Sequence, residues 1–387
     1  MKIKIARIIT RMDLGGAQQA VLYLGERLDP DYFEQIVITG PGGLLLPELQ
    51  KIRRIKHYQV PELRRHIGPS GLWSDLQATR KIRQILQSEK PHLVHTHTPK
   101  AGIVGRWAAW AARIPVILHT FHGFGFSDSH GIIKKQLYVQ VERLTAKITT
   151  RFVAVCDRNR IKGEVYEIFR RENCSLIRSG VDLNLFGKSE FSKAQKKMEL
   201  GVSPTDMIVG NVASFTPSKG LHHFLQAADK IRNKLPGVRF VIAGDGTLRP
   251  QLEMLIKQFQ LQEAVMLLGW RRDIPDLLKT FDVFLLTSLW EGLPRVLVEA
   301  ALTGVPIVAS NVDGVPEITR DGENGFLVAP GETNAMADRI VYLLRDATLR
   351  TTMGQRGRTI AQSFSLEKML DDYSVLYSDL VANLARI

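Results

Sequence analysis

Two glutamates, Glu291 and Glu299, flank the seven residues GLPRVLV and carry the clearest chemical potential in this sequence. Carboxylates accept hydrogen bonds well from neighbouring hydroxyl groups of a sugar. Gly292 removes the Cβ that would keep a ligand away from the backbone. We therefore expect both carboxylates to face hydroxyl groups of a ligand. Alternatively, Glu291 is an ordinary favourable charge in the first turn of a helix, and Glu299 is an ordinary exposed helix residue.

The elements around these glutamates are those of a parallel sheet. Residues 281–288 form a short apolar run typical of a strand buried on both faces. Pro294 can begin a helix, because proline lacks only an N–H that the first turn leaves unpaired. We predict a helix over 294–302 that ends at Gly304 and is followed by another buried strand. Ligands bind outside the carboxyl ends of such strands, and a helix N-terminus favours an anion such as a diphosphate.

The order Glu291-Gly292-Leu293-Pro294, followed by Glu299, resembles the donor-site motif of the family-four retaining glycosyltransferases, and the resemblance covers nearly the whole chain. It implies an α/β fold of GT-B type, with two Rossmann-like doubly wound domains facing each other across a cleft. It also implies retaining transfer of a hexose or N-acetylhexosamine from a nucleotide-diphosphate sugar to a hydroxyl of a glycan or lipid-linked acceptor. Such reactions build cell-surface polysaccharides or glycolipids.

The resemblance also assigns roles to single residues. Lys219 and the amides near 293–296 would hold the diphosphate together with the glycine turn in the first domain, and His122 would contact the transferred sugar. Glu291 would bind the sugar hydroxyls and Glu299 the ribose. The catalytic residues are then His122, Glu291 and Lys219, and the donor-binding residues are Gly15, Gly16, Lys219, Trp270, Arg271, Glu291, Gly292, Leu293, Pro294, Arg295, Val296 and Glu299.

One position departs from the family pattern. Where the family carries a Gly-Arg pair before the diphosphate lysine, this chain has Ala213-Ser214. We expect one of two outcomes. Either Lys219 acts together with Arg295 or with an arginine of the first domain, or the diphosphate is bound more weakly than is usual in the family.

The sequence gives no indication of a metal site. His95 and His97 lie two residues apart, but no carboxylate or cysteine accompanies them, so a structural or acceptor-side role is favoured over metal binding. Asp29-Pro30-Asp31 closes a helix and reads as a turn. No required metal and no other cofactor are expected.

The chain has 387 residues, which suits two domains. We predict a first domain over 1–184 completed by a crossover helix over 365–387, and a nucleotide-sugar domain over 185–364. No apolar run approaches the ~18 residues of a membrane span, and the N-terminus predicts a strand and glycine loop rather than a signal peptide. A cytoplasmic protein is expected, with Cys156 and Cys174 reduced and structural.

The excess of positive over negative charge lies entirely in the first half of the chain. Residues 1–186 contain 29 Lys and Arg against 16 Asp and Glu, whereas the remaining residues are neutral overall. The densest stretch, 51–66, could be a solvated face, or it could attract an anionic membrane surface, a lipid diphosphate or a nucleic acid. We hypothesise that 51–65 lies on the surface of a membrane that holds a polyprenyl-linked or other lipid-linked acceptor.

Two other functions compete with the transferase. A nonhydrolysing UDP-sugar epimerase shares the fold but lacks the Glu-Gly-Leu-Pro arrangement. A nucleic-acid-binding protein would suit the pI of 9.7, but no basic-aromatic platform or helix-turn-helix pattern is visible, so no nucleic acid is expected. UDP is favoured over GDP as the donor nucleotide.

Overall fold

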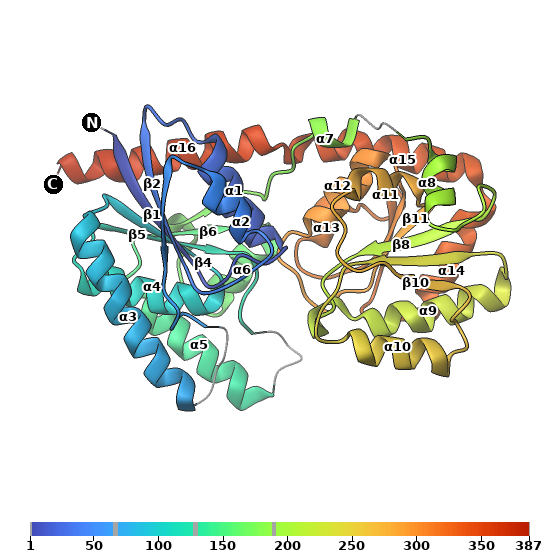
Figure 1. The fold of residues 1–387 in the computed structure, drawn as a ribbon, viewed down its shortest axis with the longest axis horizontal. Coiled ribbons are helices and arrows are strands. Elements are labelled where there is room, and N and C mark those ends of the chain that lie inside the picture. The colour runs from blue at the N-terminus through green and yellow to red at the C-terminus, as the bar shows by residue number, and fades with distance from the viewer. Residues whose placement is uncertain (1, 65–68, 127–130, 188–190, 387) are drawn as a thin grey trace. The chain divides into compact units, whose positions relative to one another are not determined.

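The structure is a computed structural model that describes residues 2–64, 69–126, 131–187 and 191–386 (Figure 1). The chain divides into two compact units. Unit 1 comprises Met1–Ser179 and Glu367–Ile387, and unit 2 comprises Gly180–Leu366.

Unit 1 is built on a seven-stranded sheet in the order β3-β2-β1-β4-β5-β6-β7, with all neighbours parallel. Its inner strands are short runs of branched apolar residues, as expected for strands covered on both faces. The strands are β1 (Ile3–Ile9), β2 (Phe33–Thr39), β3 (Ile55–Gln59), β4 (Leu93–His97), β5 (Val116–Phe121), β6 (Arg151–Ala154) and β7 (Cys174–Leu176).

Helices connect these strands and bury apolar side chains against the sheet. They are α1 (Gly16–Arg27), α2 (Leu46–Lys51), α3 (Pro69–Glu89), α4 (Pro99–Ala111), α5 (Ile132–Ala146), α6 (Asp157–Val165) and the short η1 (Arg171–Asn173). The late helix α16 (Leu366–Ala382) and η4 (Asn383–Arg386) also belong to this unit apart from residue 366.

Unit 2 holds a six-stranded parallel sheet in the order β10-β9-β8-β11-β12-β13. Its strands are β8 (Ile208–Val212), β9 (Arg239–Ala243), β10 (Val265–Leu267), β11 (Val283–Leu286), β12 (Ile307–Ser310) and β13 (Gly325–Val328). Its helices are α7 (Asn184–Gly187), α8 (Lys193–Glu199), η2 (Pro217–Lys219), α9 (Leu221–Lys234), α10 (Arg249–Gln258), α11 (Ile274–Thr280), α12 (Arg295–Thr303), α13 (Val315–Ile318), α14 (Thr333–Arg345), α15 (Ala347–Ala361) and η3 (Gln362–Phe364).

The two sheets share one topology. In each, the chain moves outward in one direction from a central strand and then returns to the other side of that strand, so the direction of winding reverses between β1 and β4 and between β8 and β11. Two Rossmann-like doubly wound domains are therefore confirmed. The carboxyl ends of these central strands are where an open sheet of this kind binds ligands.

Helix α16 follows unit 2 in the chain but packs on the sheet of unit 1. The hydroxyl of Tyr377 is 2.7 Å from Nδ1 of His95, and the hydroxyl of Tyr373 is 3.1 Å from Oγ1 of Thr120. Both tyrosines are buried. The helix therefore covers polar groups of β4 and β5 that would otherwise be exposed.

The division between the units lies a few residues from the predicted boundaries at 184 and 364. Val181 donates its N–H to the carbonyl of Phe364 and accepts from the N–H of Leu366, both at 2.9 Å. A Cβ on Gly180 would lie 2.7 Å from Cα of Leu366. The two connecting segments are thus paired with each other, and both belong to unit 2.

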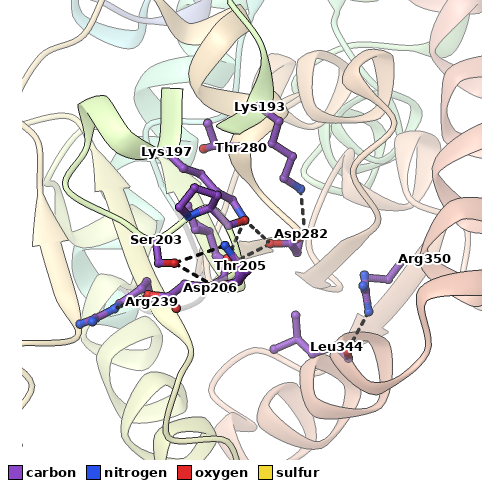
Figure 2. A network of polar contacts seen from close by, with 12 residues as sticks. Lys193, Lys197, Ser203, Thr205, Asp206, Arg239, Thr280, Asp282, Leu344 and Arg350 are labelled. Atoms are coloured by element: carbon purple, nitrogen blue, oxygen red, sulfur yellow. Dashed lines mark hydrogen bonds and ion pairs between the residues drawn. The ribbon is translucent and has the colours of Figure 1, made fainter. Parts of the chain in front are cut away.

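Buried charges at the amino edge of unit 2 are structural (Figure 2). Nζ of Lys197 donates to the carbonyls of Pro204 and Asp206 at 3.3 and 2.6 Å, and it lies 3.7 Å from Asp282. Asp282 also pairs with Lys193 at 2.8 Å and accepts from the N–H of Ile208 at 2.9 Å. These contacts fix α8 to the starts of β8 and β11. Burial lowers the pKa of Lys197.

Candidate active site

The loop after β11 and the loop after β8 meet at the carboxyl edge of unit 2. Lys219 ends η2, and Gly220, with φ +55°, turns the chain into α9. A Cβ at Gly220 would lie 2.3 Å from the carbonyl oxygen of Thr287, so only glycine fits. Thr287 donates its hydroxyl to the carbonyl of Lys219 at 3.1 Å, and the N–H of Leu289 donates to Ser218 at 2.7 Å. These contacts join the two loops.

Lys219 and Glu291, 72 positions apart in the chain, form an ion pair in this place. Nζ of Lys219 is 2.6 Å from Oε1 of Glu291. The same oxygen accepts the hydroxyl of Ser288 at 2.6 Å, and the N–H of Glu291 donates to Oδ2 of Asp313 at 2.7 Å. The lysine side chain is 21% exposed and the glutamate 9%. The pair is therefore held in place and is still reachable by a ligand.

Helix α12 begins beside this pair. Pro294, the predicted first residue of the helix, is its N-cap, so α12 starts one residue later than predicted, and among the described residues no side chain caps it. The helix ends at Thr303, with Gly304 in the left-handed conformation as predicted for that position. Gly292, Leu293 and Pro294 are buried. The N–H groups that every helix leaves without an intrahelical acceptor thus lie next to an ion pair, which suits an anionic group.

Arg295 and Glu299 occupy the first turns of α12. Nε of Arg295 donates to the carbonyl of Gly180 at 3.1 Å, and its NH2 lies 3.7 Å from Oε1 of Glu299. Burial raises the pKa of Glu299, and Arg295 opposes that shift. Val296 is partly exposed. Because Arg295 already binds a carbonyl and a carboxylate, it is poorly placed to replace the missing arginine of the family pattern.

Hydroxyl groups occupy the position of that missing arginine. Ser214 Oγ is 3.4 Å from Oγ1 of Thr216, which is 3.2 Å from Oγ of Ser218. All three precede Lys219 in the loop after β8. These three residues, and also Ser288 and Asp313, were not predicted from the sequence, although the alternation of hydroxyl residues in SFTPS was a visible signal.

The two predicted donor-binding residues that follow β10, Trp270 and Arg271, differ in accessibility. Trp270 is 42% exposed. The guanidinium of Arg271 instead pairs with Asp273, at 2.8 and 2.5 Å, and with Glu199 at 3.0 Å. These hydrogen bonds, led by that of Asp273, raise the pKa of Arg271 further. The arginine side chain is thus part of an ion-pair cluster, and Trp270 is the more accessible of the two.

The carboxyl edge of unit 1 contains Gly15, Gly16 and His122. Gly15 is the N-cap of α1, which starts at Gly16, and both glycines are exposed after β1. His122 follows β5, and its Nε2 lies 3.0 Å from Nδ1 of His97, the last residue of β4. Burial lowers the pKa of His122 to about 4, so its ring is neutral at pH 7.

Further histidines pack beneath His122. His95 is bonded through one ring nitrogen to Tyr377 and through the other to Thr120, both at 2.7 Å, and has the structural role favoured by the sequence. Burial lowers the pKa of His95 and of His97 well below the usual value. Nε2 of His97 is buried without a hydrogen-bond partner among the described residues.

This unpaired nitrogen favours one arrangement of protons. A buried N–H without an acceptor is rarer than a buried acceptor without a donor. The proton of His97 therefore belongs on Nδ1, where it is donated to Nε2 of His122. His122 then keeps its own proton on Nδ1 and can donate it to a ligand.

Within the described ranges, no group of three His, Cys, Asp or Glu side chains is arranged to hold a metal ion. Cys156 and Cys174 are both buried, and neither forms a disulfide within the described residues, consistent with the prediction that they are reduced and structural. No helix in the described part of the chain is long and apolar enough to cross a membrane.

Comparison with known proteins places this geometry in a family. Residues 192–360 match the model described as glycosyl transferases group 1, and residues 15–160 match the glycosyl transferase 4-like domain. The UDP-Gal:alpha-D-GlcNAc-diphosphoundecaprenol alpha-1,3-galactosyltransferase of Escherichia coli is 33% identical over 99% of this chain and 98% of its own. The chain belongs to the family-four glycosyltransferases.

Solved structures agree with this assignment. Anabaena HepE in complex with UDP and glucose superimposes with a TM-score of 0.84 at 25% identity, over 97% of this chain and 100% of HepE. WaaG, a glycosyltransferase involved in lipopolysaccharide biosynthesis, shares the fold with a TM-score of 0.80 at 16% identity, over 96% and 99% of the two chains. The predicted family, the GT-B fold class and the hexosyltransferase class are confirmed.

Proposed function

We propose that this glycosyltransferase moves a hexose from a UDP-sugar to a hydroxyl of a sugar on a polyprenyl diphosphate carrier, with retention of anomeric configuration. The Lys219–Glu291 pair beside the N-terminus of α12 carries the proposal, because it combines a cation for a diphosphate with a carboxylate for sugar hydroxyls. The names of the E. coli relative and of the HepE complex support UDP over GDP and a lipid-linked acceptor.

In this mechanism the diphosphate is the leaving group and also the base. The bond between C1 of the sugar and the diphosphate oxygen breaks, and the acceptor oxygen bonds to C1 on the same face. The acceptor proton passes to the departing phosphate. Lys219 and the free N–H groups of α12 stabilise the charge that develops on that phosphate. This step uses no resident metal and no protein nucleophile.

The remaining residues bind the donor. Glu291 accepts hydrogen bonds from the sugar hydroxyls, and Glu299 accepts from the ribose. The exposed ring of Trp270 lies against the base. His122, neutral at pH 7, donates to the transferred sugar, and Gly15 and Gly16 let the backbone of α1 approach the phosphate.

The direct test is an assay with a synthetic GlcNAc-diphosphate lipid as acceptor and a panel of UDP- and GDP-hexoses. We expect transfer from a UDP-hexose. The product should have the same axial or equatorial configuration at C1 as the donor, as measured from the coupling constant of the anomeric proton. Inversion at C1 would overturn the retaining assignment. Epimerisation of the donor without any acceptor would favour the epimerase.

Binding can be tested separately from turnover. Ligands that bind only the folded state stabilise it by mass action, so UDP should raise the melting temperature more than GDP at equal concentration. Lys219→Met should reduce the shift with either nucleotide, because Lys219 is assigned to the diphosphate that UDP and GDP share. Lys193→Met is the matched control, because Lys193 also pairs with a carboxylate of unit 2 but lies at the amino edge. A larger shift with GDP would overturn the choice of UDP.

A lipid-linked acceptor also gives a location. We place the enzyme in the cytoplasm, peripherally on the inner face of the membrane. Fractionation of cells that express the tagged protein tests this location. Recovery of all the protein in the soluble fraction at both low and high salt would count against it.

A further inference from the structure

Helix α5 exposes a row of large apolar side chains along its outer face. The row has the spacing i, i+4, i+8 and i+11, which places its members on one side of an α-helix. It consists of Ile133, Leu137, Val141 and Leu144. Ile133 is 88% exposed and Leu137 is 65% exposed. The opposite face buries Val139, Glu142 and Thr145 in unit 1, so this row is additional to what the fold itself requires.

The first turns of α3 are also apolar and exposed. Leu72, Trp73 and Leu76 are each about two thirds exposed. Seven residues after Trp73 and Leu76, and so on the same side of the helix, lie the exposed Arg80 and Arg83. The outer face of α3 is thus apolar at its N-terminal end and cationic further along.

The N-terminal ends of the two apolar surfaces lie at the same edge of unit 1. Both helices follow parallel strands, so both begin at the carboxyl edge of the sheet, and α4 contacts each of them. Figure 1 shows the N-terminal ends of α3 and α5 at one end of the unit. This is the edge that also contains His122.

The charge of unit 1 selects the partner. Over its residues unit 1 contains 31 Lys and Arg against 19 Asp and Glu, a net charge of +12, whereas unit 2 has 21 against 20. Lys134 is exposed beside Ile133 in the first turn of α5. A second copy of this chain would bring a cationic face against another, which is unfavourable. Apolar side chains beside Lys and Arg are instead typical of a surface that lies in the interface of an anionic bilayer.

The basic stretch that the sequence indicated, 51–65, is less suited to this contact. Lys56 and Tyr58, in β3, both bond to Glu89. Arg54 donates to the carbonyls of Gly25 and Glu26. Much of this charge is therefore used within unit 1, while Arg65 and His66 lie outside the described residues.

We propose that the first turns of α3 and the outer face of α5, here called the docking edge, insert into the headgroup region of an anionic membrane. The docking edge consists of Leu72, Trp73, Leu76, Ile133, Leu137, Val141 and Leu144, with Arg80, Arg83 and Lys134 binding the lipid headgroups. The proposal rests on the proposed function, since it presents a lipid-linked acceptor to the edge that contains His122. Its test does not depend on activity.

Vesicle flotation of the full chain is the test. Wild type should float with vesicles of phosphatidylcholine and phosphatidylglycerol and much less with phosphatidylcholine alone. The double variant Ile133→Ser/Leu137→Ser should lose about tenfold or more in binding, because two exposed leucine-sized side chains no longer enter the bilayer. Arg80→Gln/Arg83→Gln should lose about 25-fold on anionic vesicles and little on neutral ones.

The matched control is Ile161→Ser/Val165→Ser on α6. These residues have the same i, i+4 spacing and are exposed, Val165 by 70%, but they lie outside the docking edge. Equal loss of binding in the control would overturn the proposal, as would equal flotation on neutral and anionic vesicles. If the wild type is a dimer, and Ile133→Ser/Leu137→Ser makes it a monomer without changing flotation, the docking edge binds a second copy of the chain and the membrane proposal is wrong.

A water-soluble acceptor separates this proposal from the proposed function. With a short-chain GlcNAc-diphosphate acceptor in detergent-free buffer, Ile133→Ser/Leu137→Ser should retain wild-type turnover. Inactivity of the wild type on both acceptors would reject the proposed reaction and leave the flotation result intact. Loss of turnover by the variant on the short acceptor would reject a role limited to membrane contact.

Discussion

The carboxyl edges of the two sheets share a strand order but differ in charge. In unit 2, β8 and β11 bring together a lysine and a glutamate that are partly open to solvent. In unit 1, β4 and β5 bring together His97 and His122, which burial keeps neutral. The shared topology determines where a site forms, and the loops determine its chemistry.

Burial explains why the two edges use different residue types. A charge that is removed from water needs a partner, and Lys219 and Glu291 supply one another. Histidine can instead lose its proton, and the stacked histidines of unit 1 do so. Unit 2 thereby offers charge to a charged diphosphate, whereas unit 1 offers a neutral N–H to an uncharged sugar.

The comparison is tested most strongly by acid. Burial lowers the pKa values of His95, His97, His119 and His122, so the unfolded chain takes up their protons before the folded one does. The stabilising contribution of these neutral histidines to unit 1 should be complete above the ordinary histidine pKa of about 6.5 and should fall as the pH drops toward 4. Hydrogen exchange of peptides from β4 and β5 at pH 7 and pH 5 measures this loss.

Unit 2 provides the internal control for that experiment. The pKa of Glu299 is raised, so the folded state holds its proton more tightly and gains stability as pH falls toward 4.5. Burial lowers the pKa of His222, so this histidine destabilises the folded state as pH falls and opposes the gain from Glu299. Exchange from β8 and β11 should therefore change less than exchange from β4 and β5. An equal or larger change in unit 2 would contradict the contrast.

Removing the cation of unit 2 should have the next largest effect. Lys219→Met removes the side chain assigned to the leaving diphosphate and leaves Glu291 without its partner. We expect kcat/KM to fall by about 10²- to 10³-fold, the usual effect of losing one group that stabilises developing charge. Lys193→Met should stay near wild type. Steady-state kinetics of the two purified variants decides between them.

Glu291→Gln separates sugar recognition from diphosphate binding. The amide keeps the size of the side chain but no longer holds Lys219 by charge. We expect kcat to fall by about 10²-fold, while the Kd for UDP, measured by calorimetry, does not rise. A weaker Kd for UDP would mean that Glu291 acts by orienting Lys219 and not by contacting the sugar.

The smallest effect is expected in unit 1. His122→Asn keeps one N–H donor but moves it, and should lower kcat/KM by about 10- to 100-fold. Because the pKa of His122 is about 4, the wild-type rate should be independent of this group between pH 6 and 8. A rate that rises through pH 6.5 and loses that rise in His122→Asn would show that the ring titrates during turnover.

Much of the fold was predictable because its signals are local. Local sequence signals identified β1, β11 and β12, and Pro294 and Gly304 marked the ends of α12. β3 escaped because IKHYQ is an edge strand whose polar residues hide the apolar signal. That omission also made its cations look more available than the structure shows.

The site was less predictable because its contacts are long-range. The residue types of Lys219, Glu291 and His122 fitted a resemblance, but the pairing of Lys219 with Glu291 depends on the adjacency of β8 and β11. The hydrogen bond of His97 to His122 likewise depends on the pairing of β4 with β5. Ser288 and Asp313 had no signal at all, because a single serine or aspartate in a loop is common.

The position of α16 has a consequence for biosynthesis. A ribosome makes the first 179 residues of unit 1 early, yet Tyr373 and Tyr377 emerge only after all of unit 2 has been translated. Until then His95 and Thr120 have no tyrosine hydroxyls to bond, and the nascent sheet stays open to water on that side. The earlier-made half of this enzyme is therefore the later one to mature.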